Sequence, residues 1–362
     1  MSFRAAIAIG CLFITFLNGS PTVSAQGIPP CGWERTTTLD VPWAGDGDLW
    51  CVERVVEDIT FGAIGFYHIT AADDGSLYAT LPVLNSVAHI TDTDGDQLPD
   101  TTTMILSNLT RPVGIDWHDG ALYIAGNEHL YRYDVADNEL STLADDIPWG
   151  WTGYPTAGVT VHDERVYVTA GGDAACTPGR GAVYSYALDG SDRETIAEGL
   201  MAPADVAYMH GALWVADTAS ERVLELLPGA DYGACSGAQA PDVAAYTFAA
   251  GSGPVALAAY DAETFPPLEN RLLVALHGDI SNVIVEGYDV VALAFDGGTP
   301  VSHSNVLPVV PQYPAISEQK LHIQASGIYP NPVQGVAVDG NGWVYVTAGT
   351  GRVYGLRPLV ME

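Results

Sequence analysis

Short segments in which apolar and polar residues alternate after a turn recur along the chain. This alternation has a period of two, which is typical of a β-strand with one buried face. One clear example is "HDGALYIAG", residues 118–126. Five related segments are "DDGSLYAT" (73–80), "HDERVYVTAGG" (162–172), "MHGALWVAD" (209–217), "LENRLLVALHG" (268–278) and "GNGWVYVTAG" (340–349).

Most copies stand among further short strands, such as "PVGIDW" (112–117) before one copy and "HLYRYDV" (129–135) after it. The aromatic residues Tyr78, Tyr123 and Tyr167 recur about every 45 residues, close to the length of a four-stranded propeller blade. Six such units predict an all-β fold, a six-bladed β-propeller. An aperiodic β-sandwich is the structural alternative.

The last copy ends near Pro358, which leaves its blade one outer strand short. Strand-like segments before residue 60, "RTTTLDV" or "VERVVEDI", can supply that strand. We therefore predict that an N-terminal strand closes the last blade and removes an open sheet edge. Residues 26–60 would then form a single domain with the propeller at 61–362.

The first 25 residues have the pattern of a secretory signal peptide. Arg4 is followed by an apolar run over residues 5–17 and by "VSA" before Gln26, a small-residue cleavage pattern. The alternative is an uncleaved membrane anchor. No later run is long and apolar enough to span a membrane. We expect a secreted protein, extracellular or periplasmic.

Four cysteines remain after signal cleavage removes Cys11, and an exported protein would keep them in an oxidising compartment. They form no C-x-x-C pair and have no histidine close by, which favours disulfides over zinc. Three pairings are possible. Proximity in sequence favours Cys31 with Cys51. The other two are Cys176 and Cys235.

The charge balance excludes some partners. The chain has 44 acidic residues against 13 basic ones, and Lys320 is its only lysine. Such a surface repels nucleic-acid phosphates and anionic lipids. An acidic surface is compatible with calcium, with cationic partners or with a salty habitat. The alternative is that it only maintains solubility. We expect a monomer. Asn108 begins an N-glycosylation motif, "NLT", whose use depends on the host.

The segment "DTDGDQLPD" places aspartates two residues apart. Oxygen atoms at this spacing can converge on a hard cation, as in an EF-hand loop. The segment also resembles the acidic calcium repeats of thrombospondin type 3, with Gln97 where glycine is common. The alternative is an empty Asp/Gly turn. The predicted calcium ligands are Asp92, Asp94, Asp96, the Leu98 carbonyl and Asp100.

No hydrolase or nucleotide motif is present: the nine histidines form no H-E-x-x-H and there is no G-x-S-x-G. Several segments, including "LTRPVGIDWHDGALYIAGNEHLYRY", "GADYGACSG" and "FPPLENRLLVALHGDISNVIVEGYDVVALAFDGG", resemble the soluble quinoprotein glucose and sorbosone dehydrogenases. The resemblance covers residues 57–356. It implies a six-bladed propeller that binds pyrroloquinoline quinone (PQQ) and calcium on its top face, and a disulfide between Cys176 and Cys235.

At the active-site positions the sequence departs from this family. Gly153 stands in the place of the catalytic histidine, and Met201-Ala202 replace an Arg-Asn pair that faces the quinone. Asp289 replaces a lysine. The family does share a histidine-glycine pair at His277, the residue most suited here to act as a catalytic base.

Two function classes follow. The first is a PQQ-dependent oxidoreductase acting on a sugar or related alcohol. The second is a catalytically degenerate propeller that binds a carbohydrate or a partner protein on the same face, since a fold shared with enzymes does not establish an enzyme. For either class, loop position makes the further ligand-binding candidates Arg111, Trp151, Tyr154, Asp173, Asp217 and Asp279.

Overall fold

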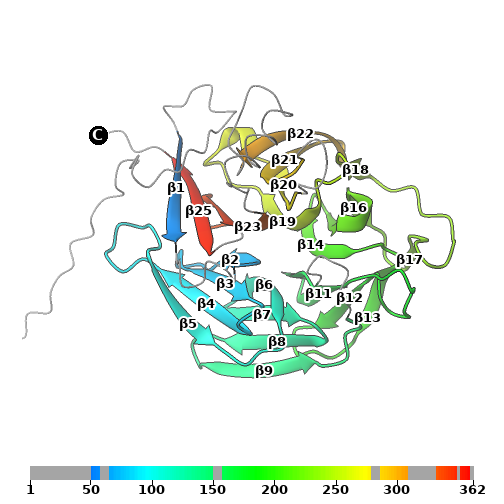
Figure 1. The fold of residues 1–362 in the computed structure, drawn as a ribbon, viewed down its shortest axis with the longest axis horizontal. Coiled ribbons are helices and arrows are strands. Elements are labelled where there is room, and N and C mark those ends of the chain that lie inside the picture. The colour runs from blue at the N-terminus through cyan, green and yellow to red at the C-terminus, as the bar shows by residue number, and fades with distance from the viewer. Residues whose placement is uncertain are drawn as a thin grey trace, which may run out of the picture.

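Six antiparallel sheets surround a central channel in the computed structural model, which describes residues 50–57, 65–149, 157–278, 286–308, 332–348 and 351–358 (Figure 1). The all-β, six-bladed propeller predicted from the repeats is confirmed. Outward from the channel the strands follow chain order in five blades, and in blade 6 the outermost strand is β1. Among the described residues, no helix is long and apolar enough to cross a membrane.

The first three blades run from residue 69 to residue 198. Blade 1 contains β2 (Ile69–Ala71), β3 (Leu77–Leu81), β4 (Ser86–Thr91) and β5 (Thr101–Leu106). Blade 2 contains β6 (Pro112–His118), β7 (Ala121–Gly126), β8 (His129–Asp134) and β9 (Glu139–Ala144). Blade 3 contains β10 (Val159–His162), β11 (Arg165–Ala170), β12 (Ala182–Ala187) and β13 (Glu194–Glu198).

The other three blades complete the ring. Blade 4 contains β14 (Pro203–Met209), β15 (Ala212–Asp217), the 3-10 turn η1 (Thr218–Ser220), β16 (Arg222–Leu226) and β18 (Ala245–Thr247). Blade 5 contains β19 (Pro254–Tyr260), η2 (Pro266–Leu268), β20 (Arg271–Leu276), β21 (Asp289–Asp296) and β22 (Thr299–Pro308). Blade 6 contains β23 (Val333–Val338), β24 (Val344–Ala348), β25 (Arg352–Pro358) and β1 (Trp50–Glu57).

The predicted closure is also confirmed. Strand β1 pairs antiparallel with β25, so that Trp50 lies opposite Pro358 and Glu57 opposite Arg352 (Figure 1). The N-terminal strand therefore becomes the outer strand of the last blade and joins the two ends of the ring. Residues 1–49, with the predicted signal peptide and Cys31, lie outside the described residues. The backbone of Cys51 lies in β1.

The core of the described residues consists of six hydrophobic clusters, one at each seam between adjacent blades. The repeated aromatic residue of the second strand fills the seam: Tyr78 lies between blades 1 and 2, and Tyr123 between blades 2 and 3. Trp214 does the same between blades 4 and 5. The 45-residue repeat in the sequence is thus a repeat of seam contacts.

One detour departs from the four-strand pattern. Between β16 and β18 the chain crosses to blade 3, where β17 (Ala230–Asp231) pairs in parallel with β13 as a fifth strand. A disulfide between Cys176 and Cys235 fixes this detour, with the two Cα atoms 5.4 Å apart. The pairing that the family resemblance implies is therefore confirmed. Closing a loop of 59 residues stabilises the fold by about 4 kcal/mol in the chain-entropy model.

Hydrogen bonds from threonines in a second strand, or just after one, to the inner-strand region of the next blade hold the blades in register around the channel. The Thr80 hydroxyl donates to the Val113 carbonyl at 2.6 Å, and the Thr218 hydroxyl donates to the Pro254 carbonyl at 2.6 Å. The Thr347 hydroxyl donates to the Tyr67 carbonyl, which links the last blade to the first. A few hydroxyl groups therefore satisfy buried carbonyls that no ladder reaches.

Replacing Thr80 by valine tests this linkage, because valine keeps the shape of the side chain and leaves the Val113 carbonyl without its donor. We expect Thr80→Val to lower the free energy of unfolding by about 1–3 kcal/mol, measured by chemical denaturation. Thr142→Val, at an exposed position of β9, is the control and should change it by less than about 0.5 kcal/mol. Equal effects of the two variants would contradict the inter-blade role of Thr80.

Candidate functional site

The top face is the end of the ring where the innermost strands begin and the second strands end. Four of the predicted site residues lie on it. Arg111 directly precedes β6, Asp173 follows β11, Asp217 ends β15, and His277 follows β20. The other candidates, Trp151, Tyr154 and Asp279, lie outside the described residues, as does Gly153.

A cavity of about 650 Å³ opens on this face between blades 3 and 4. Its walls are mostly apolar, with one carboxylate, that of Asp173, on the lining. This volume falls in the range of small-molecule sites. The lining residues include Asp173, Ala174, Met201, Ala202, Ala219 and the Cys176–Cys235 disulfide.

Arg180 lies beside this cavity, and its guanidinium group has protein partners. It forms an ion pair with Asp173 and donates hydrogen bonds to the carbonyls of Gly171, at 2.9 Å, and Gly172, at 3.0 Å. Hydrogen bonds from the Thr177 amide and hydroxyl, and then the Arg180 charge, lower the pKa of Asp173. The edge of the cavity is therefore an internally paired, hydrogen-bonding surface.

Asp217 faces the backbone of the chain. Its carboxylate accepts hydrogen bonds from the amides of Met201 (3.1 Å) and Ala202 (2.5 Å), and only 3% of the residue is exposed. Burial raises the pKa of this carboxyl group. The side chain of Met201 is 51% exposed beside the cavity, whereas Ala202 is buried. Asp217 thus positions the turn that presents Met201.

His277 is half-buried at the top of blade 5. Its main-chain amide donates to the Gly253 carbonyl at 2.8 Å, and its Nδ1 lies 2.9 Å from the Gly278 carbonyl. A carbonyl oxygen only accepts, so Nδ1 carries the ring hydrogen in this contact. In the neutral ring Nε2 is then the acceptor nitrogen, which is the form that a catalytic base requires.

Asp289, at the start of β21, is buried beneath the same face, with 7% of its surface exposed. Burial raises the pKa of its carboxyl group to about 8. Its Oδ1 atom is buried without a hydrogen-bond partner among the described residues. The aspartate that stands where the resembled family has a lysine therefore lies inside the blade, and its raised pKa favours the protonated form at neutral pH.

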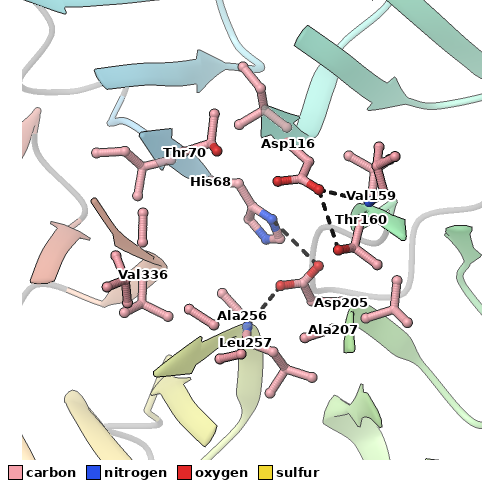
Figure 2. A pocket seen from close by; sticks show the side chains of 18 of the residues that line it. His68, Thr70, Asp116, Val159, Thr160, Asp205, Ala207, Ala256, Leu257 and Val336 are labelled. Carbon is pink, nitrogen blue, oxygen red and sulfur yellow. Dashed lines mark hydrogen bonds and ion pairs between the residues drawn. The ribbon is translucent and has the colours of Figure 1, made fainter. Parts of the chain in front are cut away.

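The channel contains a second group of functional side chains. Figure 2 shows the side chains of His68, Asp116 and Asp205 converging, and all three line a cavity of about 260 Å³. Nδ1 of His68 lies 3.9 Å from Oδ1 of Asp205. Burial lowers the pKa of His68 to about 4, raises that of Asp116 to about 6, and raises that of Asp205 well above its ordinary value.

The sequence analysis did not identify these three residues. The available signal was at the starts of the inner strands, where Asp205 follows "PA" and Gly114 follows "PV" at the equivalent place. This signal can be recognised only when the register of the strands is known, because His68 lies outside all six repeat segments.

The segment that contains the four aspartates, residues 92–100, is called the aspartate loop below. It joins β4 to β5 at the opposite end of the ring from the top face. Carboxylate oxygens of Asp92, Asp94 and Asp100 lie within 4.8 Å of one another. Asp96 is buried, and its Oδ1 accepts a hydrogen bond from the Leu98 amide at 2.8 Å. Gln97 has φ = 71°, so it adopts the left-handed conformation in place of the glycine common at that position.

No protein-family model and no curated protein matches this sequence. Solved structures do match in fold. The PQQ domain of pyranose dehydrogenase from Coprinopsis cinerea, in its holo form, aligns over 91% of this chain and 99% of its own, with 13% identity and a TM-score of 0.62.

A calcium structure of a Trichoderma reesei member of carbohydrate-active enzyme family AA12 aligns over 89% of this chain and 98% of its own, with 15% identity and a TM-score of 0.63. A streptogramin B lyase aligns over 86% of this chain and 98% of its own, with 10% identity and a TM-score of 0.50. At these identities the likeness is one of fold. Since a lyase and dehydrogenases share it, the site must decide the function.

The raised pKa of Asp289 predicts a pH-dependent stability. A carboxyl group with a folded pKa near 8 and an unfolded pKa near 4 stabilises the fold below pH 4 and loses that contribution as the pH rises through 8. We expect the difference in unfolding free energy between wild type and Asp289→Asn to shift in favour of the variant by several kcal/mol from pH 5 to pH 8.

Chemical denaturation at several pH values measures this difference, and it isolates Asp289 from the opposing contribution of His68. The control is Asp137→Asn, at an exposed turn, which should follow the wild-type profile. Parallel profiles for wild type and Asp289→Asn would show that Asp289 does not titrate between pH 5 and pH 8.

Proposed function

We propose that this protein is a ligand-binding propeller with a sugar-dehydrogenase-like architecture, and that its top-face cavity between blades 3 and 4 takes a carbohydrate. The observation that carries the proposal is the turn at Met201 and Ala202. The family that this chain resembles has two polar side chains at this turn, and both face the quinone. In this chain the turn has the exposed thioether of Met201 and the buried methyl group of Ala202. The proposal is therefore that this face binds a ligand without the contacts that a quinone needs.

The electrostatics favour a neutral or cationic ligand. The chain has a formal net charge of −31. Within the described part of the top face, the guanidinium beside the cavity, that of Arg180, is already paired with Asp173. Sugar hydroxyls would bond to the Asp173 carboxylate, and the C–H faces of the ring would pack on Met201 and the alanines. An anionic ligand would be repelled.

PQQ does not fit this chemistry. A tricarboxylate needs charge-assisted contacts, and hydride abstraction from a sugar needs a base beside the quinone. The positions that would supply them hold Met201, Ala202 and the buried, protonated Asp289. We therefore assign no quinone-dependent step to this site.

The Cys176–Cys235 disulfide lines the cavity and fixes one wall of it. A structural disulfide persists in oxidising compartments. This supports the proposal that the protein acts outside the cytosol, as a secreted extracellular or periplasmic protein. A rigid wall also reduces the entropy lost when a ligand binds.

We also propose that the aspartate loop binds calcium in a structural role. Asp92, Asp94 and Asp100 supply oxygen ligands of the kind that Ca²⁺ prefers, and the left-handed Gln97 makes the turn that such a loop needs. The loop lies at the end of the ring away from the top-face cavity. The ion would therefore stabilise blade 1 without contacting the ligand.

PQQ-dependent sugar oxidation is the second candidate function, and one observation favours it. His277 is held with Nδ1 toward the Gly278 carbonyl, which leaves Nε2 as the acceptor nitrogen on the top face. A base at this position could act on a sugar hydroxyl. It would require a quinone to bind without the family's cationic contacts.

Carbohydrate binding is tested by saturation-transfer NMR with a panel of free pyranoses and short oligosaccharides. We expect saturation transfer to at least one sugar in the wild type. Ala174→Trp, at an exposed position on the cavity wall, should abolish it by filling the cavity. Ala136→Trp, in an exposed turn at the opposite end of the ring, is the matched control and should retain it.

No transfer to any sugar in the wild type, or transfer unaffected by Ala174→Trp, would show that this cavity is not a carbohydrate site.

The second candidate is tested by dye-linked glucose oxidation with added PQQ and calcium. We expect at most weak turnover, since loss of a positioned base typically costs 10²- to 10⁴-fold in rate. Brisk turnover would contradict the absence of quinone chemistry. In that case His277→Ala would decide the base: lost turnover assigns it to His277, and unchanged turnover assigns it to another residue.

Calcium binding is tested by thermal unfolding after removal of metal with a chelator. Adding Ca²⁺ should raise the melting temperature of the wild type, because a ligand at 100 times its Kd stabilises a fold by about 2.7 kcal/mol. The double variant Asp92→Asn/Asp94→Asn should show no such rise. A wild-type melting temperature that Ca²⁺ leaves unchanged would exclude the calcium site.

A further inference from the structure

Six equivalent positions surround the channel at the level where the inner strands begin to pair. Each lies opposite, or next to, the next-to-last residue of the second strand of its own blade. The pairs Gly114–Ala125, Asp205–Ala216 and Gly335–Thr347 are examples. In the order of the blades the six residues are His68, Gly114, Gly158, Asp205, Ala256 and Gly335.

Four of these positions hold glycine or alanine, and close packing of the inner strands explains why. A Cβ atom added at Gly114 would overlap the Ala157 carbonyl of the next blade, and one at Gly335 would lie 2.7 Å from the Tyr67 carbonyl. A large side chain fits only where it extends into the channel. Of the six positions, only two therefore have a large side chain, namely His68 and Asp205.

His68 in blade 1 and Asp205 in blade 4 are three blades apart, so they face each other across the axis. Nδ1 of His68 lies 3.9 Å from Oδ1 of Asp205, and both side chains are more than 90% buried. The other oxygen of Asp205 accepts a hydrogen bond from the Leu257 amide at 2.8 Å. That bond holds the carboxylate with Oδ1 toward the imidazole, as Figure 2 shows.

A third polar side chain, Asp116, points into the same space from blade 2 (Figure 2). It accepts hydrogen bonds from the Val161 amide at 2.7 Å and from the Trp117 amide at 3.0 Å. The described residues that line the cavity include no lysine or arginine. The buried carboxyl group of Asp205 and the half-buried one of Asp116 therefore share the cavity with the His68 imidazole, and no lysine or arginine among its lining residues balances their charge.

We propose that the channel binds one divalent cation of borderline softness, such as Zn²⁺, Co²⁺ or Mn²⁺, through Nδ1 of His68 and Oδ1 of Asp205, with Asp116 reaching it through a bound water. An imidazole nitrogen with carboxylate oxygens is the donor set that suits these ions. This inference concerns a site separate from the top-face cavity and does not rest on the proposed function.

The geometry fits one ion between the two donors. A metal about 2.1 Å from each donor, at a tetrahedral angle, would place the two donors about 3.4 Å apart, so the observed 3.9 Å requires the two side chains to close by about 0.5 Å around the ion. The cavity of about 260 Å³ leaves room for the waters that complete the coordination. Burial also keeps His68 neutral, with a pKa of about 4, and neutral imidazole is the form that binds metal.

Isothermal titration of metal-free protein with CoCl₂, together with the visible absorption of bound Co²⁺, tests the site. The titrations use the Asp92→Asn/Asp94→Asn background, so that the aspartate loop does not compete. We expect one bound Co²⁺, displaced by ZnCl₂. Adding Asp205→Asn or His68→Gln should weaken binding by more than about 100-fold, since even changes in an outer coordination shell cost about 10- to 100-fold.

Asp116→Asn should weaken binding by about 10-fold, because that residue acts through water. His162→Gln is the matched control: His162 lines the same cavity near its far end and should leave binding unchanged. The asparagine at position 205 still accepts the Leu257 hydrogen bond, so this variant is expected to fold, as circular dichroism would show. If His68→Gln does not fold, Asp205→Asn alone decides.

Absence of Co²⁺ and Zn²⁺ binding at millimolar metal would overturn the proposal and leave His68 and Asp205 as two buried ionisable groups 3.9 Å apart. Binding that Asp205→Asn leaves unchanged would also overturn it. Loss of binding in His162→Gln, with binding retained in Asp205→Asn, would move the metal to the other end of the cavity.

Discussion

The structure depends on how the innermost strand of each blade satisfies its inner edge. That edge faces the channel and has no neighbouring strand, so its amide and carbonyl groups need partners from elsewhere. The preceding blade supplies them: the Thr80 hydroxyl of blade 1 donates to the Val113 carbonyl of blade 2, and the carboxylates of Asp116 and Asp205 accept hydrogen bonds from amides of the blades that follow. These bonds require the strands to lie close together, which restricts most ring positions to glycine or alanine.

This constraint leaves three places along the channel axis for the proposed sites, namely the top face, the channel and the aspartate loop. The top face is built from loops that the ring positions rigidly, so its chemistry changes without disturbing the blades. The channel is tight enough that any large polar residue in it is held in a fixed place. The aspartate loop lies beyond the sheets, where it affects only blade 1. The proposed ligand site and the proposed ion sites therefore lie in separate parts of one scaffold.

Much of this architecture is readable from the sequence, because each repeat encodes one seam. Tyr78, Tyr123 and Trp214 recur since each must fill the gap between two blades, and their spacing therefore predicts the number of blades. The closing strand followed from a blade that ended one strand short. The Cys176–Cys235 pair came from family resemblance. The fifth strand of blade 3, β17, left no signal, since only two residues of it pair.

The site was less predictable, for identifiable physical reasons. Asp217 and Asp289 look like exposed loop acids in the sequence, but the fold turns one toward backbone amides and buries the other inside a blade. His68 and Asp205 meet only because three blades of curvature bring them to opposite sides of one channel. Such a contact depends on the closure of the whole ring, which no local pattern contains.

Our central proposal is that this propeller, which shares the fold of quinoprotein sugar dehydrogenases, has no quinone site on the described part of its top face. Equilibrium dialysis of the purified protein against PQQ in the presence of calcium tests it most directly, because it measures binding without requiring turnover. The account predicts no saturable binding up to millimolar PQQ. One equivalent bound at micromolar concentration would contradict it.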